Sequence, residues 1–318
     1  TLLCPIKTDL ENFVPPFVNV IRYPFLHLPF ISGHNLRLLY SRLARFRPTV
    51  IHCLSKKYEH FARKAAHHFG IKYVMSVDRI DKTGSGFHLT SHACGGVIVP
   101  SETIGNITAK KRPALAEKII QVNPGTFSHE GCSCFSNTRQ VPTVVTTLYE
   151  GKARVDAFSN FLGALRHLLI DGYEFMVLTI IDRQMPKSIH ELIGDLGLRP
   201  TVIFSSRKHD WHKILCQADI FVKTCATSHY EYLLLEGMAA GMAMTGCNEN
   251  LEDLLIKDET ALIFDSDDQL SIYGALMKLL NGHDFARKLA RGGQELIRQN
   301  HSASKMVDEM IHVYSRMK

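Results

Sequence analysis

Short apolar runs alternate with amphipathic stretches along almost the whole chain. This alternation predicts strands connected by helices, which is the pattern of a parallel α/β fold. The apolar runs predict strands at residues 48–54, 71–77, 95–99, 117–122, 143–148, 173–181, 201–204, 218–222 and 242–245, and a last strand near residue 262. The amphipathic stretches predict helices at 36–47, 60–69, 155–171, 188–196 and 209–216, one helix on each side of 242–245, and a helical tail over 267–318.

The segment 126–140 is polar and irregular, and it separates two series of strand and helix signals. A chain of 318 residues is long enough for two domains with separate cores. We therefore predict a first domain at 1–130, a second at 131–300 and a C-terminal helix at 301–318. A Rossmann-like domain normally opens with a strand, a glycine-bearing turn and a helix. Residues 1–13 look more like a second strand and its loop, which indicates that the first βα unit is missing or divergent.

The charge of the chain is distributed unevenly. Of the 37 Lys and Arg, 17 lie in residues 1–125, and of the 31 Asp and Glu only 7 do, which leaves 20 against 24 for residues 126–318. A basic half attracts an anionic partner, such as a phospholipid surface, a phosphorylated acceptor or a nucleic acid. The chain has no RNP-like motif, zinc finger or helix-turn-helix signature, so we expect no nucleic-acid partner. No run reaches the roughly 18 apolar residues of a membrane span, so we expect a cytoplasmic protein that is at most peripheral at the inner membrane face.

Two features of the basic half each have two interpretations. Residues 13–32 are rich in proline and large apolar side chains, and they form either core packing or an interfacial, acceptor-contacting patch. Helix 36–47 places Leu36, Leu39 and Leu43 on one face and its arginines on the opposite side. It either covers a sheet with its polar face in solvent or lies near anionic lipid. An anionic membrane surface is therefore a candidate partner.

The eight cysteines are scattered, and several lie in apolar, strand-like runs. This distribution favours reduced, buried thiols of a cytosolic protein. Cys132 and Cys134 with His129, and Cys94 with His92, are residue types that ligate zinc. Because they lack a paired CxxC arrangement, we predict no metal site.

The most informative stretch is 218–264, which predicts the series strand, helix, strand, helix, strand. Its first helix carries one acid, Glu236, and ends in Ala-Ala-Gly at Gly241. Together with the runs RPTVIHCLS, GGVIVPSE and KIIQVNPGTF, in this order, the stretch resembles the nucleotide-sugar half of a GT-B glycosyltransferase of the retaining group known as family 4. The resemblance implies two Rossmann-like domains facing across a cleft, with the C-terminal helix packing back on the first domain.

The resemblance also implies where the sugar nucleotide binds. In the family, the second acid of a Glu-x7-Glu pair binds the ribose and the first contacts the donor sugar. Glu236 stands at the second position, whereas Ser228 stands at the first. Glu231 is closer to Glu236 along the chain, lies on a different helical face and does not substitute for the first acid.

The diphosphate of the donor is expected between a loop and a set of cations. Backbone N–H groups of the loop after the helix, and the next helix N-terminus, favour phosphate. The residues implied there are Gly241, Thr245, Gly246 and Asn248. In place of the family's GRL…KG pattern the chain has VTTLYEGKARVD, with Thr146 and Thr147 where Gly and Arg are expected. The candidate cations are Lys152, Arg154, Arg207 and Lys208.

Asp78 stands at the end of a predicted strand, where the family often has a histidine. It either orients an acceptor hydroxyl, as the catalytic residue, or caps the following turn. The resemblance implies a retaining transferase that moves a hexose from a UDP- or GDP-sugar to a lipid-linked or polysaccharide acceptor, without a metal or other cofactor.

The family pattern is broken at three positions, Ser228, Thr147 and Asp78. The alternative is therefore a catalytically impaired protein that serves as a scaffold or binding subunit of a glycan-assembly complex. A dinucleotide-dependent oxidoreductase is disfavoured, because no GxGxxG follows a strand.

Overall fold

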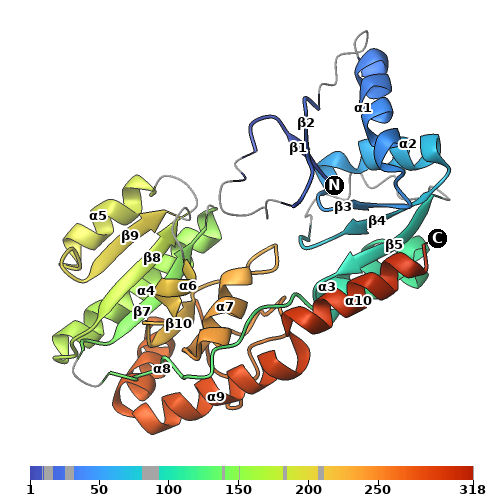
Figure 1. Cartoon of the computed structure of the whole chain (residues 1–318). Helices are drawn as coiled ribbons and strands as arrows, with labels where there is room; N and C mark the ends of the chain where they lie inside the picture. Colours follow the sequence, from blue (N-terminus) through green and yellow to red (C-terminus); the bar gives the residue numbers. More distant parts are fainter. Residues whose placement is uncertain are drawn as a thin grey trace. The chain divides into compact units, whose positions relative to one another are not determined.

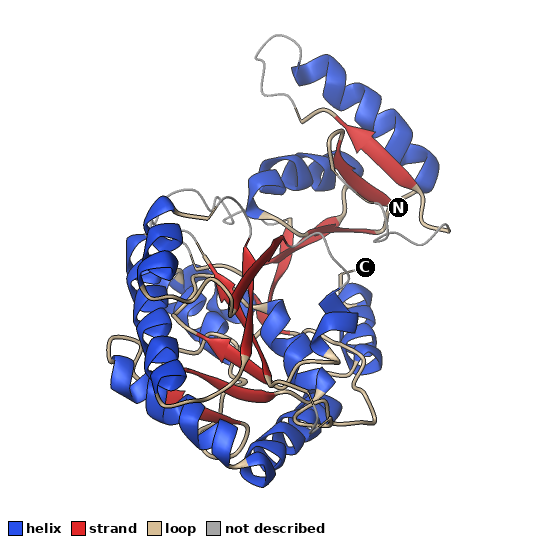
Figure 2. Cartoon of the chain, turned by 90° about the vertical axis from the view of Figure 1, so that its left-hand side faces the viewer, coloured by secondary structure: helices blue, strands red, loops and turns tan. Residues whose placement is uncertain are grey.

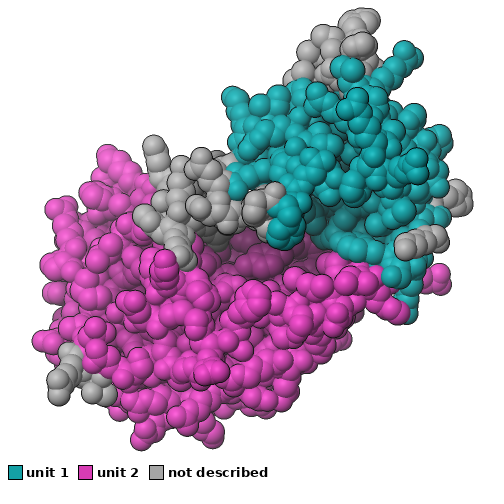
Figure 3. All heavy atoms as spheres, viewed as in Figure 1, with its two compact units in different colours: residues 1–76, 86–97, 313–318 teal, residues 77–85, 98–312 magenta. Residues whose placement is uncertain are grey.

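The computed structural model describes residues 1–8, 10, 17–25, 32–80, 93–137, 140–149, 151–181, 185–206 and 211–317, with the backbone alone for 32–35 (Figure 1). The chain divides into two compact units, which are coloured separately in Figure 3. Unit 1 comprises Thr1–Ser76, Gly86–Val97 and Val313–Lys318, and unit 2 comprises Val77–Ser85 and Ile98–His312. The domain bounds given above stay a prediction.

Unit 1 is built from short parallel strands and two helices. Strand β1 (Leu2–Pro5) pairs in parallel with β2 (Val20–Tyr23), and β3 (Val50–Cys53) pairs in parallel with β4 (Lys72–Ser76). The helical elements are α1 (Ser32–Phe46), the 3-10 turn η1 (Lys56–Tyr58) and α2 (Glu59–Phe69). Helix α2 ends at Gly70, whose φ of 63° is left-handed and favours glycine.

Helix α1 has the amphipathic arrangement that its sequence predicts. Leu36 and Leu39 are buried and cluster with Tyr23 and Phe61, while the arginines of the helix are exposed. The interpretation as a covering helix is therefore supported by packing. In the segment 13–32, residues 13–16 and 26–31 lie outside the described residues. Of the others, Tyr23 and Phe25 pack in this cluster, whereas Phe17 is 86% exposed.

Unit 2 holds a six-stranded sheet in which every pairing is parallel. Its strands are β7 (Thr143–Leu148), β8 (Met176–Ile181), β9 (Val202–Ser206), β10 (Ile220–Lys223), β11 (Ala243–Cys247) and β12 (Ala261–Phe264). The order across the sheet is β12-β11-β10-β7-β8-β9. The chain thus winds outward from β7 in one direction and from β10 in the other, so the topological switch point lies between these two strands.

Helices surround this sheet, as Figure 2 shows. They are α4 (Lys152–Ile170), α5 (Lys187–Asp195), α6 (Trp211–Leu215), α7 (Tyr232–Ala240), α8 (Gln269–Asn281) and α9 (His283–Asn300). Helix α4 packs against α5 and α8, and α7 packs against α6 and α9. Phe158, Phe161 and Leu162 of α4 are completely buried. Each such side chain contributes about 1.5–3 kcal/mol through burial.

The division between the units passes through one strand and one helix. Strand β5 (Cys94–Val99) and helix α10 (Ala303–Ser315) each begin in one unit and end in the other. The rest of unit 2 consists of α3 (Glu102–Lys111), the 3-10 segment η2 (Pro113–Lys118) and β6 (Ile119–Gln121). Among the described helices, none combines the length and apolar character that a bilayer crossing requires.

One predicted element is wrong. The helix expected between β11 and β12 is absent, and residues 248–260 form bends and turns instead. Asp253 and Asp258 have positive φ values of 58° and 61°, which a helix does not tolerate, and Leu254 is anchored in the core. Helix α7, in contrast, ends at Gly241 as predicted.

Candidate functional site

A pocket of about 790 Å³ opens in unit 2 at the carboxyl ends of the central strands. Ala153 and Arg154 follow β7, Cys225 and Ala226 follow β10, and the remaining wall comes from residues after β11 and around the end of β12. Open parallel sheets bind ligands in the crevice at this edge, next to the switch point. The wall beyond β10 is formed by Cys247, Asn248, Glu249, Lys257, Ile263, Phe264, Asp265, Ser266, Asp267 and Ser271, together with Ala157 of α4.

Arg154 is the predicted site residue that the structure places most clearly in this pocket. It lies in the first turn of α4, whose N-cap is Gly151 and whose first turn carries no acid. Its guanidinium Nη2 donates a hydrogen bond of 3.2 Å to Oγ of Ser228. Because the helix dipole and the Arg154 guanidinium add positive potential at this helix end, the pocket has one wall suited to an anion.

The opposite wall is mixed in charge. Lys257 supplies a second cation, whereas Glu249, Asp265 and Asp267 supply carboxylates. Carboxylates accept hydrogen bonds from hydroxyl groups but repel phosphate, so the pocket as a whole suits a ligand with an anionic part and a hydroxyl-rich part.

The two pocket cysteines are neutral thiols. Burial raises the pKa of Cys225 to about 11, and the nearby Glu231 carboxylate adds to this effect. Burial likewise raises the pKa of Cys247 to about 12. Since the thiolate is the reactive form, neither side chain is suited to act as a nucleophile at neutral pH.

A buried ionic network lies where β7 and β10 end. Lys223, the last residue of β10, pairs with Glu252, and both side chains are essentially inaccessible to solvent. A second carboxylate oxygen of Glu252 accepts a hydrogen bond of 3.0 Å from the backbone N–H of Glu231, which caps α7. Burial lowers the pKa of the Lys223 ammonium, but Glu252 and Glu231 outweigh this effect, so its pKa lies above the ordinary value. The lysine is therefore charged.

Glu231 connects this network to the end of β7. Its Oε1 accepts hydrogen bonds from Oγ1 of Thr147 at 2.7 Å and from the hydroxyl of Tyr149 at 2.8 Å. The segment between β10 and α7 is thereby fixed at its C-terminal end, and this segment carries Ser228. Thr147, which stands at the arginine position of the family, thus serves to hold Glu231, while Thr146 donates to the carbonyl of Val222.

The structure also brings Asp78 to this segment. The backbone carbonyl of Asp78 accepts a hydrogen bond of 2.8 Å from Tyr230, and the carbonyl of Ser228 accepts one of 2.7 Å from Ile80. Burial raises the pKa of Tyr232 to about 12, and the negative charge of Asp78 contributes to this shift. The segment that carries the predicted catalytic residue is therefore joined by two backbone hydrogen bonds to the segment that carries the predicted sugar-contacting position.

Glu236 lies on α7 and is not among the residues that line the pocket. Its Oε1 accepts a hydrogen bond of 2.8 Å from Oγ1 of Thr126, and its Oε2 lies 3.7 Å from Nδ1 of His212. About a third of its side chain is exposed, at 34%. Its carboxylate is thus held in one orientation and reachable from solvent.

Two of the predicted loop residues are placed differently from expectation. Thr245 and Gly246 belong to strand β11 and are buried. Thr245 donates to the carbonyl of Leu262, and Gly246 lies so close to Lys223 that a Cβ would approach its Cβ to 2.9 Å. The strand was predicted to end at Thr245, where the loop was expected to begin, but β11 continues to Cys247. Asn248, just beyond the strand, does line the pocket.

The remaining predicted residues differ in how far the structure tests their placement. Gly241 has a φ of 80° and ends α7, so its role in the fold is structural. Lys152 is exposed at the start of α4, and it is absent from the pocket wall. Arg207 and Lys208 lie outside the described residues.

Sequence reasoning missed the Lys223–Glu252 pair and Lys257. A lysine that ends an otherwise apolar strand is a signal for a buried partner, but the sequence does not say which acid supplies it. The position of Lys257 depends on the turns that replace the predicted helix.

Residues 142–282 match the family model described as Glycosyl transferases group 1. No curated protein matches the chain by sequence. Among solved structures, a glycosyltransferase from Rickettsia africae superposes with a TM-score of 0.77 at 14% identity, covering 94% of this chain and 85% of that one. Alr3699/HepE of Anabaena in complex with UDP-glucose gives 0.74 at 13% identity, covering 93% and 85%. Sucrose-phosphate synthase from Thermosynechococcus elongatus gives 0.68 at 14% identity, covering 93% and 82%. These likenesses show a GT-B fold with two Rossmann-like domains, as the sequence predicts.

Proposed function

We propose that the chain transfers a hexose from a nucleotide-diphosphate sugar to a lipid-linked or polysaccharide acceptor, because residues 142–282 match the family model described as Glycosyl transferases group 1. The anomeric configuration is retained. The observation that carries the proposal is the pocket beside the switch point, where Arg154 and the N-terminus of α4 meet a carboxylate-rich wall.

In this proposal the diphosphate binds against the first turn of α4. Arg154 and the positive end of the helix dipole stabilise the charge that grows on the leaving nucleotide as the bond between the sugar and the diphosphate breaks. Ser228 acts on the donor through Arg154, whose guanidinium it fixes. Lys257 contacts the outer phosphate in this scheme, and Asp265 and Asp267, which line the same pocket, accept hydrogen bonds from sugar hydroxyls.

The pocket has the size that such a donor needs. Ligand sites typically enclose about 300–1,000 Å³, and this one encloses about 790 Å³. A UDP-sugar is the donor we favour over a GDP-sugar, because the similar Anabaena protein forms a complex with UDP-glucose. No metal is needed at the diphosphate in this scheme, since the chain supplies its own cations.

Three further roles follow the resemblance. Glu236 receives the ribose hydroxyls, with Thr126 and His212 orienting its carboxylate. Asp78 orients the acceptor hydroxyl beside the Ser228 segment, to which it is bonded through the backbone. The basic half of the chain attracts the anionic acceptor or the membrane surface that presents it, and in this proposal the protein works in the cytoplasm, peripheral to the inner membrane face.

One observation favours the second candidate, a catalytically impaired subunit of a glycan-assembly complex. At two of the family's polar positions the chain has Ser228 and Thr147, and both hydroxyls are used inside the protein, for Arg154 and for Glu231. A site whose hydroxyl groups are engaged in hydrogen bonds within the protein can bind a donor without activating it.

Calorimetric titration with UDP, GDP and ADP, and with their common hexose conjugates, tests the donor site. We expect one nucleotide to bind saturably and Arg154→Ala to weaken its binding roughly tenfold to a hundredfold, since charge-assisted hydrogen bonds contribute about 1.5–3 kcal/mol. Arg166→Ala, which removes an exposed arginine from the same helix, is the matched control and should bind normally. If the folded protein binds none of these compounds, the proposed donor site is wrong.

A further inference from the structure

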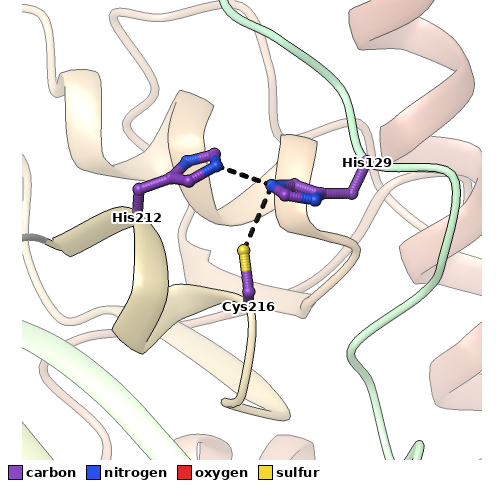
Figure 4. A group of neighbouring side chains, drawn as sticks. All are labelled: His129, His212 and Cys216. Carbon is purple, nitrogen blue, oxygen red and sulfur yellow. Dashed lines mark hydrogen bonds between the residues drawn. The ribbon is translucent and has the colours of Figure 1, made fainter.

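Three side chains with metal-binding atoms meet outside the pocket. They are His129, which precedes β7, and His212 and Cys216, which lie on and just after α6 (Figure 4). Nε2 of His129 lies 2.8 Å from Nε2 of His212 and 3.1 Å from Sγ of Cys216. The three ligand atoms all lie within 4.8 Å of one another.

Hydrogen bonds alone do not account for the close approach of these three polar atoms. A neutral imidazole nitrogen offers either one proton or one lone pair, yet Nε2 of His129 faces two polar atoms at once. A single cation placed between the three atoms accepts a lone pair from each of them. Two imidazoles and a thiolate are a ligand set for Zn²⁺, whereas Mg²⁺ and Ca²⁺ require oxygen ligands.

Backbone hydrogen bonds hold the segments that carry the three ligands. Cys216 and His212 are one helical turn apart, with the N–H of Cys216 donating to the carbonyl of His212 at 3.1 Å, so their side chains share a face. The N–H of His129 donates to the carbonyl of Ala239, and the carbonyl of His129 accepts from Gln294. The ligands therefore need only small side-chain movements, since tetrahedral zinc with bonds of about 2.0–2.3 Å separates its ligand atoms by roughly 3.3–3.7 Å.

A carboxylate stands behind one of the ligands. Oε2 of Glu236 lies 3.7 Å from Nδ1 of His212, the nitrogen that faces away from the cluster, and Thr126 fixes the same carboxylate. A carboxylate behind the ligating histidine selects its tautomer and raises its basicity, as is usual around zinc. The side chain of His212 is 47% exposed, which leaves an entry path for the ion.

We propose that His129, His212 and Cys216 form a Zn²⁺ site with a fourth position open to water. The ion ties the segment before β7 to α6 and fixes His212 beside Glu236. None of the three ligands lies in the wall of the donor pocket, although His212 lies beside Glu236, to which we assign the ribose. The proposal goes beyond the transferase function and does not depend on it. It also departs from the prediction of no metal, because the ligands are far apart in sequence and form no CxxC-type motif.

Cobalt titration of the metal-stripped full chain under reducing conditions tests the site. Co²⁺ takes tetrahedral zinc sites and reports a thiolate ligand through a charge-transfer band in the near ultraviolet. We expect one equivalent to bind saturably with this band, and Zn²⁺ to displace it. Cys216→Ser should abolish the band, and His212→Gln should weaken Co²⁺ binding at least tenfold.

Matched variants separate this site from other thiols. Cys132→Ser removes a half-buried cysteine that donates to the carbonyl of Gly241, and it should leave the band unchanged. Because His212 is largely exposed, His212→Gln should fold even if Cys216→Ser does not. The proposal is overturned if the wild-type protein shows no saturable band, or if the band survives both Cys216→Ser and His212→Gln. Loss of nucleotide binding with an intact cobalt band would instead count against the donor site alone.

Discussion

Replacing Lys223 by methionine should destabilise unit 2 strongly. The Lys223 and Glu252 side chains are 1% and 0% exposed, so their ion pair is shielded from water. Removing one partner of a buried pair costs about 3–5 kcal/mol, because the other charge stays buried without compensation. Here the loss leaves two carboxylates, Glu252 and Glu231, on one buried network. We therefore expect Lys223→Met to lower the free energy of unfolding by about 3–5 kcal/mol.

Urea unfolding measures this loss, and the fluorescence of Trp211, the only tryptophan of the chain, reports on unit 2. The double variant Lys223→Met with Glu252→Gln is the matched control, since the amide oxygen still accepts the N–H of Glu231. It should recover most of the loss, because replacing both partners of a buried pair by neutral groups is often close to neutral. A single variant within about 1 kcal/mol of the wild type would refute the reasoning.

The pH dependence supplies an independent check with a defined sign. Burial already raises the pKa of Glu252 in the wild type, and loss of Lys223 removes the main opposing effect. A carboxyl whose pKa is raised on folding contributes its stability below the unfolded value of about 4.3 and loses it as the pH rises through the folded value. The difference between Lys223→Met and the wild type should therefore shrink from pH 7 to pH 5.

Three other changes have outcomes that unfolding or binding measurements decide. Burial lowers the pKa of His52 to about 4. The free energy of unfolding of the wild type should therefore fall by about 3 kcal/mol from pH 6.5 to 4, because His52 takes up a proton in the unfolded state. Urea unfolding of His52→Gln should lack this fall. Gly241→Ala should lower the free energy of unfolding by on the order of 1–3 kcal/mol, and by more than Gly172→Ala does. Both glycines have positive φ, but only at Gly241 would a Cβ meet backbone, 2.8 Å from Cα of Cys132. Equal urea midpoints for the two variants would contradict this. Ser228→Ala should weaken calorimetric nucleotide binding roughly threefold to tenfold, by removing one of the hydrogen bonds that position Arg154; unchanged affinity would contradict it.

Local sequence signals predicted the regular elements well. Strand β7 begins and ends where its apolar run does, and helices α2 and α7 end at Gly70 and Gly241, whose positive φ values favour glycine. These features depend on residues within a few positions of one another, which a sequence displays directly. The missing helix between β11 and β12 shows the limit, because Leu254 and the left-handed Asp253 are fixed by tertiary packing.

The candidate site was only partly predictable for the same reason. Arg154, Ser228 and Asp78 were identified from motif positions, but their mutual contacts come from the sheet order and from one short backbone pairing. The loop was expected to begin at Thr245, the last residue of the predicted strand, yet pairing with the neighbouring strands on both sides keeps Thr245 and Gly246 in β11. No spacing rule connects Lys223 with Glu252.

The central claim is that the pocket at β7 and β10 activates a nucleotide-diphosphate sugar for transfer. Its most direct test follows release of the nucleoside diphosphate from the donor that binds best, by NMR, in the presence of simple glycoside and lipid-linked acceptors. We predict release above the uncatalysed rate, a product with the anomeric configuration of the donor, and loss of release in Arg154→Ala. A folded protein that binds the donor and releases no nucleotide with any acceptor would contradict the claim and leave the impaired subunit as the better account.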